Sequence, residues 1–446
     1  MSYFLYKLKL AGKRMMMEYK TTAMIVLLAG LVSQVRAQHI VTDTLTLAYC
    51  HKLVDETYPL AEQFELQQKI TDLNKKIIRT GNLPQFNVDA KTTYQTEIPE
   101  VDIPFQGAES VTMSKDQYSL GLDIHQNIYD GGRVGKKQII EEAIEKEQNA
   151  QTRVDLHQVK LQLNQVYFSI LLSKQQMNNN QTLIEDLKEQ LHQIQSKVNN
   201  GVLLPSQKYI IEAELLRIKQ DSVVIASNIR AGYEIVAELI NQELTGQPPL
   251  KVPDINLAAY RMSKLRPEYE FFENQRSLLQ KKLNLEKVNK LPTISAFGTA
   301  AYANPGLDTF DDSFNPHLFF GVSLKWNFWD AFNTDRHKTI IQYQKKQIDT
   351  RADTFSKQLR TELDAISNRI DAIEENVSRD QQIIELHNKV VSEQSSQLKN
   401  GVITSTEYII ELNKLSRARV ALLLRRVQLV QQKIDYITKI GYSLQN

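Results

Sequence analysis

A long internal repeat constrains this sequence of 446 residues more than any other feature. A shift of 200 residues superimposes residues 121–130 on residues 321–330, and the glycine, asparagine and aspartate positions coincide. The same shift superimposes the Asn-Gly pair that ends at Gly201 on the pair that ends at Gly401. Two copies of this length do not make a solenoid. The sequence therefore predicts a duplicated structural unit, with a first repeat at residues 38–250 and a second at residues 251–446.

The hydrophobic period changes in the same order within each unit. Apolar residues three or four apart predict a helix over residues 42–81 and again over about 265–290. Pro84 and Pro292 end these helices, because proline lacks a backbone donor and disfavours helix in the residue before it. Alternation of apolar and polar residues follows each proline and predicts one β-hairpin per unit. The two hairpins span about residues 84–130 and 292–330.

The predicted strands are unusually long. Their alternating segments of about 10 to 13 residues exceed the five or six residues that strands usually have. This length matches the roughly 9 to 11 residues with which a tilted strand crosses a bilayer. The hairpins therefore predict membrane-spanning strands.

The longest pattern in the chain is helical. From Val134 to Asn199 there is no proline and one glycine, and apolar residues step by three and four as in a coiled coil. At about 1.5 Å per residue this helix would be roughly 100 Å long. A turn follows at Gly201, a return helix begins near Ser206, and the second unit repeats this order from about Thr334. The predicted long helical hairpins span about residues 131–240 and 331–440.

Four strands of this length predict self-association. An open sheet leaves edge N–H and C=O groups unsatisfied in hydrocarbon, so another chain must close it. Three copies would combine their four strands and four long helical segments each into a barrel and a tube. The predicted fold class is an α+β membrane channel built from a duplicated unit of long α-helical hairpins and β-hairpins. Its assembled form is a trimeric 12-stranded β-barrel on a coiled α-helical tunnel.

Residues 1–37 have the pattern of a secretory signal peptide. Lys13, Arg14 and Lys20 precede an apolar core, and the segment ends at the small residue Ala37. The alternative, a membrane-spanning helix, needs roughly 20 apolar residues, which is more than this core provides. Without the segment the formal net charge falls from +2 to −3, which argues against a nucleic-acid-binding protein. We therefore predict an exported protein.

No catalytic or metal-binding constellation stands out in the sequence. Cys50 is the only cysteine, and the histidines, among them His157 and His387, lie alone at positions that predict solvated surface. The glycine-rich stretch 130–135 has the composition of a phosphate loop, but the equivalent stretch after Asp330 lacks every glycine. Both stretches therefore predict a tight strand-to-helix joint with an aspartate near the helix start. We predict no enzymatic activity, no cofactor and no metal.

Several motifs recur in an order that points to one known family. They are the Thr-Leu-Thr-Leu-Ala-Tyr helix entry at residues 44–49, Leu83-Pro84, the Asn-Ile-Tyr-Asp-Gly-Gly-Arg junction at residues 127–133, and the turns at Gly201 and Gly401. In their order and duplication the sequence resembles the TolC-like outer-membrane efflux protein family over nearly the whole mature chain. The resemblance implies a homotrimer in the cell outer membrane that extends into the periplasm.

The resemblance also implies a function and partners. Such a channel is the exit duct of a tripartite efflux or type I secretion system, and it conducts substrates passively to the exterior. Its partners are outer-membrane lipid, a periplasmic adaptor (membrane fusion protein) and an inner-membrane RND, ABC or MFS transporter. The resemblance assigns adaptor docking to the hairpin tips, where the alternative is an ordinary helix cap with its hydrophobic contact. The tip residues are Gly201, Val202, Leu203, Gly401, Val402 and Ile403.

Two acidic residues near the second tip are the predicted pore constriction. Glu407 matches an acidic position that faces the pore in the family. The second family acid falls on Ile410 here, and the basic tip residue of some members is replaced by Ile403, which departs from the family's salt links. Glu411 lies one helical turn after Glu407, so it is predicted to share its face and add a second acidic ring.

Aromatic residues cluster where the predicted strands meet the helices. Both tryptophans of the chain are among them. An interfacial aromatic girdle is one interpretation, and ordinary packing at the joint is the other. The residues are Tyr129, Trp326, Phe328 and Trp329.

Two other classes of protein remain open. A periplasmic adaptor would also be exported, but it should have one helical hairpin flanked by small β domains. A secreted coiled-coil structural protein would lack the alternating strands. An enzyme fits least, because no constellation of residues supports one.

Overall fold

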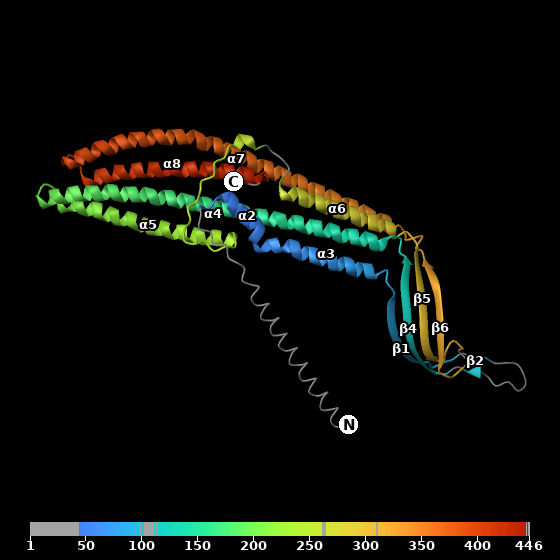
Figure 1. Ribbon diagram of the computed structural model, residues 1–446. Helices are drawn as coiled ribbons and strands as arrows, with labels where there is room; N and C mark the ends of the chain where they lie inside the picture. The colour runs from blue at the N-terminus through green and yellow to red at the C-terminus, as the bar shows by residue number, and fades with distance from the viewer. Residues whose placement is uncertain are drawn as a thin grey trace, which may run out of the picture.

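The computed structural model describes residues 44–98, 100–101, 111–112, 114–260, 265–308, 311–442 and 444. The predicted signal peptide at residues 1–37 lies outside these residues. Within them the chain is mostly helical, with one four-stranded antiparallel sheet. Figure 1 shows this sheet at one end of a long helical bundle and the turns of two helical hairpins at the other. For a single chain, the predicted combination of helices and a small antiparallel sheet is therefore confirmed.

Apart from the first helix and two short strands, the described elements of the two expected units follow the same order along the chain. The first unit holds α2 (Leu47–Thr57), α3 (Glu62–Thr80), β1 (Gln85–Tyr94), β4 (Asp116–Tyr129), α4 (Arg133–Asn199) and α5 (Pro205–Leu239). The second unit holds α6 (Pro267–Val288), β5 (Thr293–Asn304), β6 (Asn315–Lys325), α7 (Asn333–Lys399) and α8 (Ser405–Lys439). The short strands β2 (Glu100–Val101) and β3 (Val111–Thr112) pair with each other between β1 and β4. None of the helices in the described part of the chain combines the length and apolar composition that a membrane span requires.

The first helix is divided in two. The expectation of one helix over residues 42–81 is wrong, because Tyr58 is extended, with ψ of 140°, and Pro59 opens a short 3-10 helix. As a result α2 ends at Thr57, and α3 begins only at Glu62. Proline disfavours helical conformation in the residue before it, and here that effect interrupts the apolar period.

The four long strands form one sheet in the order β1-β4-β5-β6. Val88 lies opposite Leu122, Leu122 opposite Ala300, and Ala300 opposite Leu318. Because side chains alternate between the faces of a strand, this register makes one face continuously apolar. Val88 and Leu318 are exposed on it. β1 and β6 are the edges of the sheet, and neither pairs with a further strand among the described residues.

The long helices of the two units match in length and position. α4 and α7 have 67 residues each, and α5 and α8 have 35 residues each. α4 packs along α5, α7 packs along α8, and α6 contacts both α4 and α7. In the sequence, the segment Tyr209-Ile-Ile-Glu212 matches Tyr408-Ile-Ile-Glu411 only if a gap of one residue is allowed. The two helices show no such gap. Both return helices keep the shift of 200 residues, and Tyr209 is exposed whereas Tyr408 is buried.

The largest core lies around α2, which packs against α4. Tyr167 of α4 is fully buried there, and its hydroxyl shares its one proton between the carbonyl oxygens of Leu45 (2.8 Å) and Lys251 (2.7 Å). Leu45 also forms a parallel bridge with Leu250. One tyrosine near the middle of α4 thus joins the entry of α2 to the segment that follows α5.

Candidate functional site

The strand-to-helix joints are built around two equivalent aspartates. Asp130 accepts a hydrogen bond from the backbone N–H of Val134 (2.7 Å), and Asp330 accepts one from the N–H of Thr334 (2.9 Å). The two residues after each aspartate have left-handed backbone conformations, although only the first joint uses glycine. Each carboxylate satisfies an N–H group that a helix leaves unpaired at its start. The predicted strand-to-helix joint with an aspartate near the helix start is confirmed at both positions.

Both hairpin tips are closed by the same helix cap. Gly201 and Gly401 have φ values of +73° and +72°. The N–H of Val202 donates to the carbonyl of Lys197 at 2.9 Å, and the equivalent bond from Val402 is also 2.9 Å long. A glycine in the left-handed conformation followed by this bond is a Schellman motif, which satisfies carbonyl groups at the helix end. The tips therefore do form the helix caps that the sequence allowed.

The aliphatic residues of the tips are of two kinds. Val202 and Val402 are 68% and 71% exposed. Leu203 and Ile403 are partly buried and pack against an apolar cluster to which α4, α5, α7 and α8 all contribute. At each tip the bundle holds one aliphatic side chain, and a second one presents its apolar surface to the outside.

Glu407 lies beside the second tip and closes a capping box. Its Oε2 accepts from the N–H (2.7 Å) and the hydroxyl (2.9 Å) of Thr404, whose Oγ1 in turn accepts from the N–H of Glu407 (3.3 Å). The bond from the Thr404 backbone, followed by that from its hydroxyl, holds the pKa of Glu407 below its ordinary value. Since the residue is exposed, it carries a negative charge at the surface of the tip.

Glu411 does not share that exposed surface. It is only 7% exposed, and its carboxylate accepts from Nδ1 of His387 on α7 (2.6 Å) and Nζ of Lys414 (3.1 Å). Burial raises the pKa of Glu411, but the bonds from His387 and then Lys414 outweigh burial, and the pKa is lowered overall. The expectation that Glu407 and Glu411 lie on one solvated face is therefore wrong. His387 is likewise a bonding partner and not simply solvated surface.

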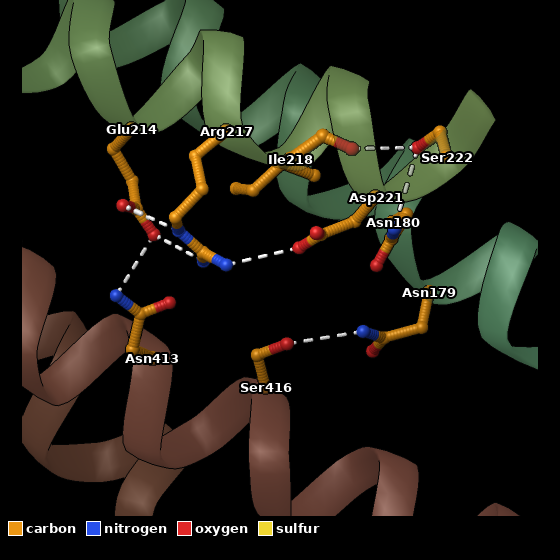
Figure 2. A network of polar contacts seen from close by, with 9 residues as sticks. All are labelled: Asn179, Asn180, Glu214, Arg217, Ile218, Asp221, Ser222, Asn413 and Ser416. Atoms are coloured by element: carbon orange, nitrogen blue, oxygen red, sulfur yellow. Dashed lines mark hydrogen bonds and ion pairs between the residues drawn. The ribbon is translucent and has the colours of Figure 1, made fainter. Parts of the chain in front are cut away.

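A polar network joins the two helical hairpins behind the tips (Figure 2). Arg217 of α5 donates two bonds to Glu214 (2.6 and 2.9 Å) and one to Asp221 (2.9 Å). Glu214 also accepts from the amide of Asn413 on α8 (2.9 Å). The bond from Arg217 is the main cause that lowers the pKa of Glu214. A charged carboxylate thus ties the first hairpin to the second.

Further bonds cross between the hairpins in the same region. Asn179 of α4 donates to Ser416 of α8 (3.0 Å), as Figure 2 shows, and Gln190 of α4 donates to Ser395 of α7 (3.1 Å). An open groove of about 600 Å³ lies around Asn179, Arg217 and Ser416. Sequence reasoning missed this network, since Glu214 and Arg217 are spaced as an ordinary surface pair on one helix.

The predicted interfacial aromatics lie where the sheet meets the helices. Tyr129 ends β4, and Trp326, Phe328 and Trp329 directly follow β6. The indole of Trp326 donates to the carbonyl of Lys290 (3.0 Å), so this ring belongs to the joint. Phe328 and Trp329 are 81% and 69% exposed. The Phe328 ring packs edge-on against that of Trp326 (6.1 Å between ring centroids), and both Phe328 and Trp329 keep most of their surface exposed.

His157 is buried, so its predicted place on the solvated surface is wrong. It lies on α4 and lines a cavity with His51 and Lys160. Its Nε2 has no hydrogen-bond partner in the described part of the chain. Burial, and then the nearby cations beginning with Arg266, lower the pKa of His157 to about 3, so the ring is neutral at physiological pH. Its helical position gave no signal of this, because the covering residues come from other elements.

Comparisons with known proteins bear on the fold. No protein-family model matches the sequence, and no curated relative matches it. Among solved structures, the outer membrane protein VceC of Vibrio cholerae matches with a TM-score of 0.65 and 11% identity, over 90% of this chain and 97% of that one. The outer membrane channel CmeC of Campylobacter jejuni matches at 0.63 and 12%, over 89% and 85%. The outer membrane channel MtrE of Neisseria gonorrhoeae, in its open state, matches at 0.62 and 14%, over 89% of each chain.

These structures define the class of fold. The chain folds as these outer-membrane channel proteins do, over 89–90% of its length. The resemblance to the TolC-like outer-membrane family is thereby confirmed at the level of the fold.

Proposed function

We propose that this chain is one protomer of an outer-membrane channel, the exit duct of a tripartite efflux or type I secretion system. In this role it passively conducts substrates from an inner-membrane transporter and a periplasmic adaptor to the exterior. The observation that carries the proposal is the open sheet, whose four strands of 10 to 14 residues present one apolar face at the end of helices 67 residues long.

The two sheet edges support a homotrimer. In hydrocarbon the unpaired N–H and C=O groups of β1 and β6 would each cost several kcal/mol, so a spanning sheet must close. Three copies close it as a barrel of 12 strands, since each chain contributes four. The apolar face then contacts outer-membrane lipid, and the long helices form a coiled tunnel in the periplasm. Phe328 and Trp329, together with Tyr129 and Trp326, lie at the level where the barrel leaves the membrane, as a girdle does.

The tips at the far end are the proposed docking surface. Val202 and Val402 expose apolar side chains there, held in place by the caps at Gly201 and Gly401 and by the anchored Leu203 and Ile403. A periplasmic adaptor (membrane fusion protein) would bind these tips and connect the channel to an RND, ABC or MFS transporter. Neither the alternative of an adaptor nor that of a coiled-coil structural protein accounts for a sheet with an exposed apolar face.

The proposed constriction is formed by Glu407. The residue is exposed beside the second tip, and a trimer brings three copies toward one axis. Their ionised carboxylates would create a negative potential that favours cations, as acidic rings do in other pores. Glu411 is better suited to holding α8 against α7, because its charge is buried and paired with His387 and Lys414.

Two measurements test the function. Light scattering in detergent gives the mass of the particle, and we expect three copies of the 51.3 kDa chain, less its signal peptide. Planar-bilayer recording of the same sample should show cation-preferring channels. A folded monomer without conductance would contradict the proposal and favour the structural alternatives.

A further inference from the structure

The two repeats agree in strand register as well as in helix bounds. Gln85 of β1 lies opposite His125 of β4, and Thr293 of β5 lies opposite Lys325 of β6. Adding 208 to the number of Gln85 gives Thr293, and adding 200 to the number of His125 gives Lys325. The first pair of residues is therefore equivalent to the second. The same shifts convert the end of α3 into the end of α6 and both ends of α4 into those of α7. Equivalent residues of the two repeats can therefore be assigned one by one.

The contact between the two repeats of one chain serves as a template. β4 of the first repeat pairs with β5 of the second, where Leu122 lies opposite Ala300 and His125 opposite Phe297. α6 of the second repeat packs against α4 of the first. Among the described residues, the equivalent surfaces at the outer sides of the chain have no such neighbour. β1 and β6 are sheet edges, and α3 lies at the margin of the bundle with α4 as its main helical neighbour (Figure 1).

The exposed surface of α3 has a buried equivalent in α6. Leu278 and Leu285 of α6 pack with apolar residues of α4, and Leu278 is only 9% exposed. The shift of 208 residues makes Ile70 and Ile77 of α3 their counterparts. These two side chains are 50% and 67% exposed, so α3 carries the same apolar positions without a covering helix from the described part of the chain.

The complementary surface lies on α7. In α4 the residues that receive α6 include Ile140 and Ala143, which are 8% and 7% exposed. Their counterparts in α7 are Ile340 and Tyr343, which are 50% and 61% exposed. The contact between α6 and α4 is buried within the chain. The equivalent surfaces of α3 and α7 are both exposed.

We propose that a second copy of this chain supplies the missing neighbour, in the register that β4 and β5 adopt within one chain. The inference rests on the proposed trimer and specifies its interface. With the two shifts applied, the pair Leu122 and Ala300 becomes Val322 of β6 opposite Thr92 of the second copy. The α3 helix of that second copy then covers Ile340 and Tyr343 of the first.

Charge complementarity supports this register. The pair His125 and Phe297 becomes Lys325 opposite Asp89 of the second copy, and both residues are exposed on the polar face of the sheet. Directly opposed side chains of opposite charge stabilise a sheet, whereas like charges destabilise it. A slip of two residues would place Lys325 opposite Lys91 or Asn87. A slip of one residue would turn the apolar face of one copy against the polar face of the next.

Disulfide formation between introduced cysteines tests the register of β6 against β1 of the second copy. In a Cys50→Ala background, which has no other cysteine, Val322→Cys combined with Thr92→Cys should form intermolecular disulfides on oxidation. Opposed Cβ atoms lie within reach of a disulfide, whereas diagonal neighbours are about 7–8 Å apart. The control pairs Val322→Cys with Ala90→Cys, and Val322→Cys with Tyr94→Cys, keep the same face and should stay unlinked. Non-reducing gels separate the products.

The outcomes distinguish the register from the trimer. Cross-linking of a control pair in place of the predicted pair overturns the register and leaves the proposed channel intact. Absence of every cross-link, together with a monomeric mass of the cysteine-free protein by light scattering, contradicts both. Absence of cross-links in a trimer contradicts the register alone.

Two sets of variants test the same interface without cysteines. Lys325→Asp should lower the temperature at which the trimer dissociates on a gel, and adding Asp89→Lys should restore it. Ile70→Gln with Ile77→Gln should also lower it. Glu65→Gln with Gln68→Ala should not, because their counterparts in α6, Glu273 and Arg276, stay exposed in the template contact. If the two α3 double variants lower the dissociation temperature equally, the proposed helix contact is refuted. If Lys325→Asp and Asp89→Lys lower that temperature additively when combined, the proposed strand pair is refuted.

Discussion

Nδ1 of His387 lies 2.6 Å from Oε1 of Glu411, so a side chain of α7 holds a buried carboxylate of α8. Lys414, in the next turn of α8, bonds to the other carboxylate oxygen at 3.1 Å. Glu411, which the sequence suggests as a second acidic ring of the pore, therefore links the two helices of the second hairpin, α7 and α8.

Replacing this acid should destabilise the protein in a pH-dependent way. Glu411→Gln should cost about 1.5–3 kcal/mol at neutral pH, the usual range for hydrogen bonds to a charged group. Because folding lowers the pKa of Glu411, the stability that its charge contributes is complete above the ordinary carboxyl pKa. It is lost as the pH falls through the lower native value.

Thermal unfolding by circular dichroism measures this effect. The difference in Tm between wild type and Glu411→Gln should be large at pH 7 and shrink toward pH 3. Glu393→Gln, an exposed acid of α7, is the control and should leave Tm unchanged. A difference that is constant with pH would show that the ionised carboxylate is not the stabilising form.

Neutralising Glu407 should change ion selectivity without changing the fold. Glutamine at this position can still close the capping box with Thr404, so the trimer and its yield should stay normal. Three negative charges are lost from the tip, and the cation preference measured as a reversal potential in planar bilayers should fall. Block by multivalent cations should weaken in parallel. An unchanged reversal potential would place the constriction elsewhere.

Removing bonds between the hairpins should favour an open tip. Asn413→Ala with Ser416→Ala deletes the partners of Glu214 and Asn179, which lie on the other hairpin. Each bond contributes about 0.5–1.5 kcal/mol, so their loss should raise the open population by roughly tenfold. Single-channel recording measures that population.

A matched control exists within the second hairpin. Asn388→Ala removes the bond between Asn388 of α7 and Arg419 of α8 (2.8 Å), which does not link the two hairpins. Its open population should equal that of wild type. If this variant opens the channel as much as the double variant does, general loosening of helices and not the ties between hairpins controls the tip.

The tip glycines should resist substitution. Gly401→Ala forces a Cβ into a left-handed conformation and should cost about 1 kcal/mol, although no described residue beyond its chain neighbours comes within 4 Å of that Cβ. Gly135 lies in α4 with helical geometry and also has open space around it. Gly135→Ala should therefore stabilise by about 0.5–1 kcal/mol. Urea unfolding of the two variants should shift in opposite directions, and a shift of the same sign would contradict the backbone explanation.

Features that depend on neighbours in sequence were predictable. Pro84 and Pro292 are each followed at once by the first residue of a strand, Gln85 of β1 and Thr293 of β5. The left-handed turn at Gly201 ends a helix whose 67 residues match the uninterrupted apolar period. Both follow from local backbone chemistry, in which proline and glycine restrict or permit particular dihedral angles.

Features that depend on neighbours in space were not predictable from the pattern. Glu411 and His157 occupy ordinary helical positions, yet both are buried, and residues of other elements, such as His387 of α7 beside Glu411, lie against them. The bond between Glu214 and Asn413 joins residues that are 199 positions apart in the sequence. They meet only because α5 packs on α8. A one-dimensional period identifies the buried stripe of a helix but not which of several neighbours covers its margins.

The equal length of α4 and α7 limits how the distance between the sheet and the hairpin tips can change in evolution. A single heptad inserted in one of them would carry its tip about 10 Å past the other and disrupt the bonds of Asn179 and Gln190 to the second hairpin. The return helices α5 and α8 would have to grow by the same amount. Evolution can therefore alter the distance between sheet and tips only through coordinated insertions at four places in the chain, and point substitutions leave that distance fixed.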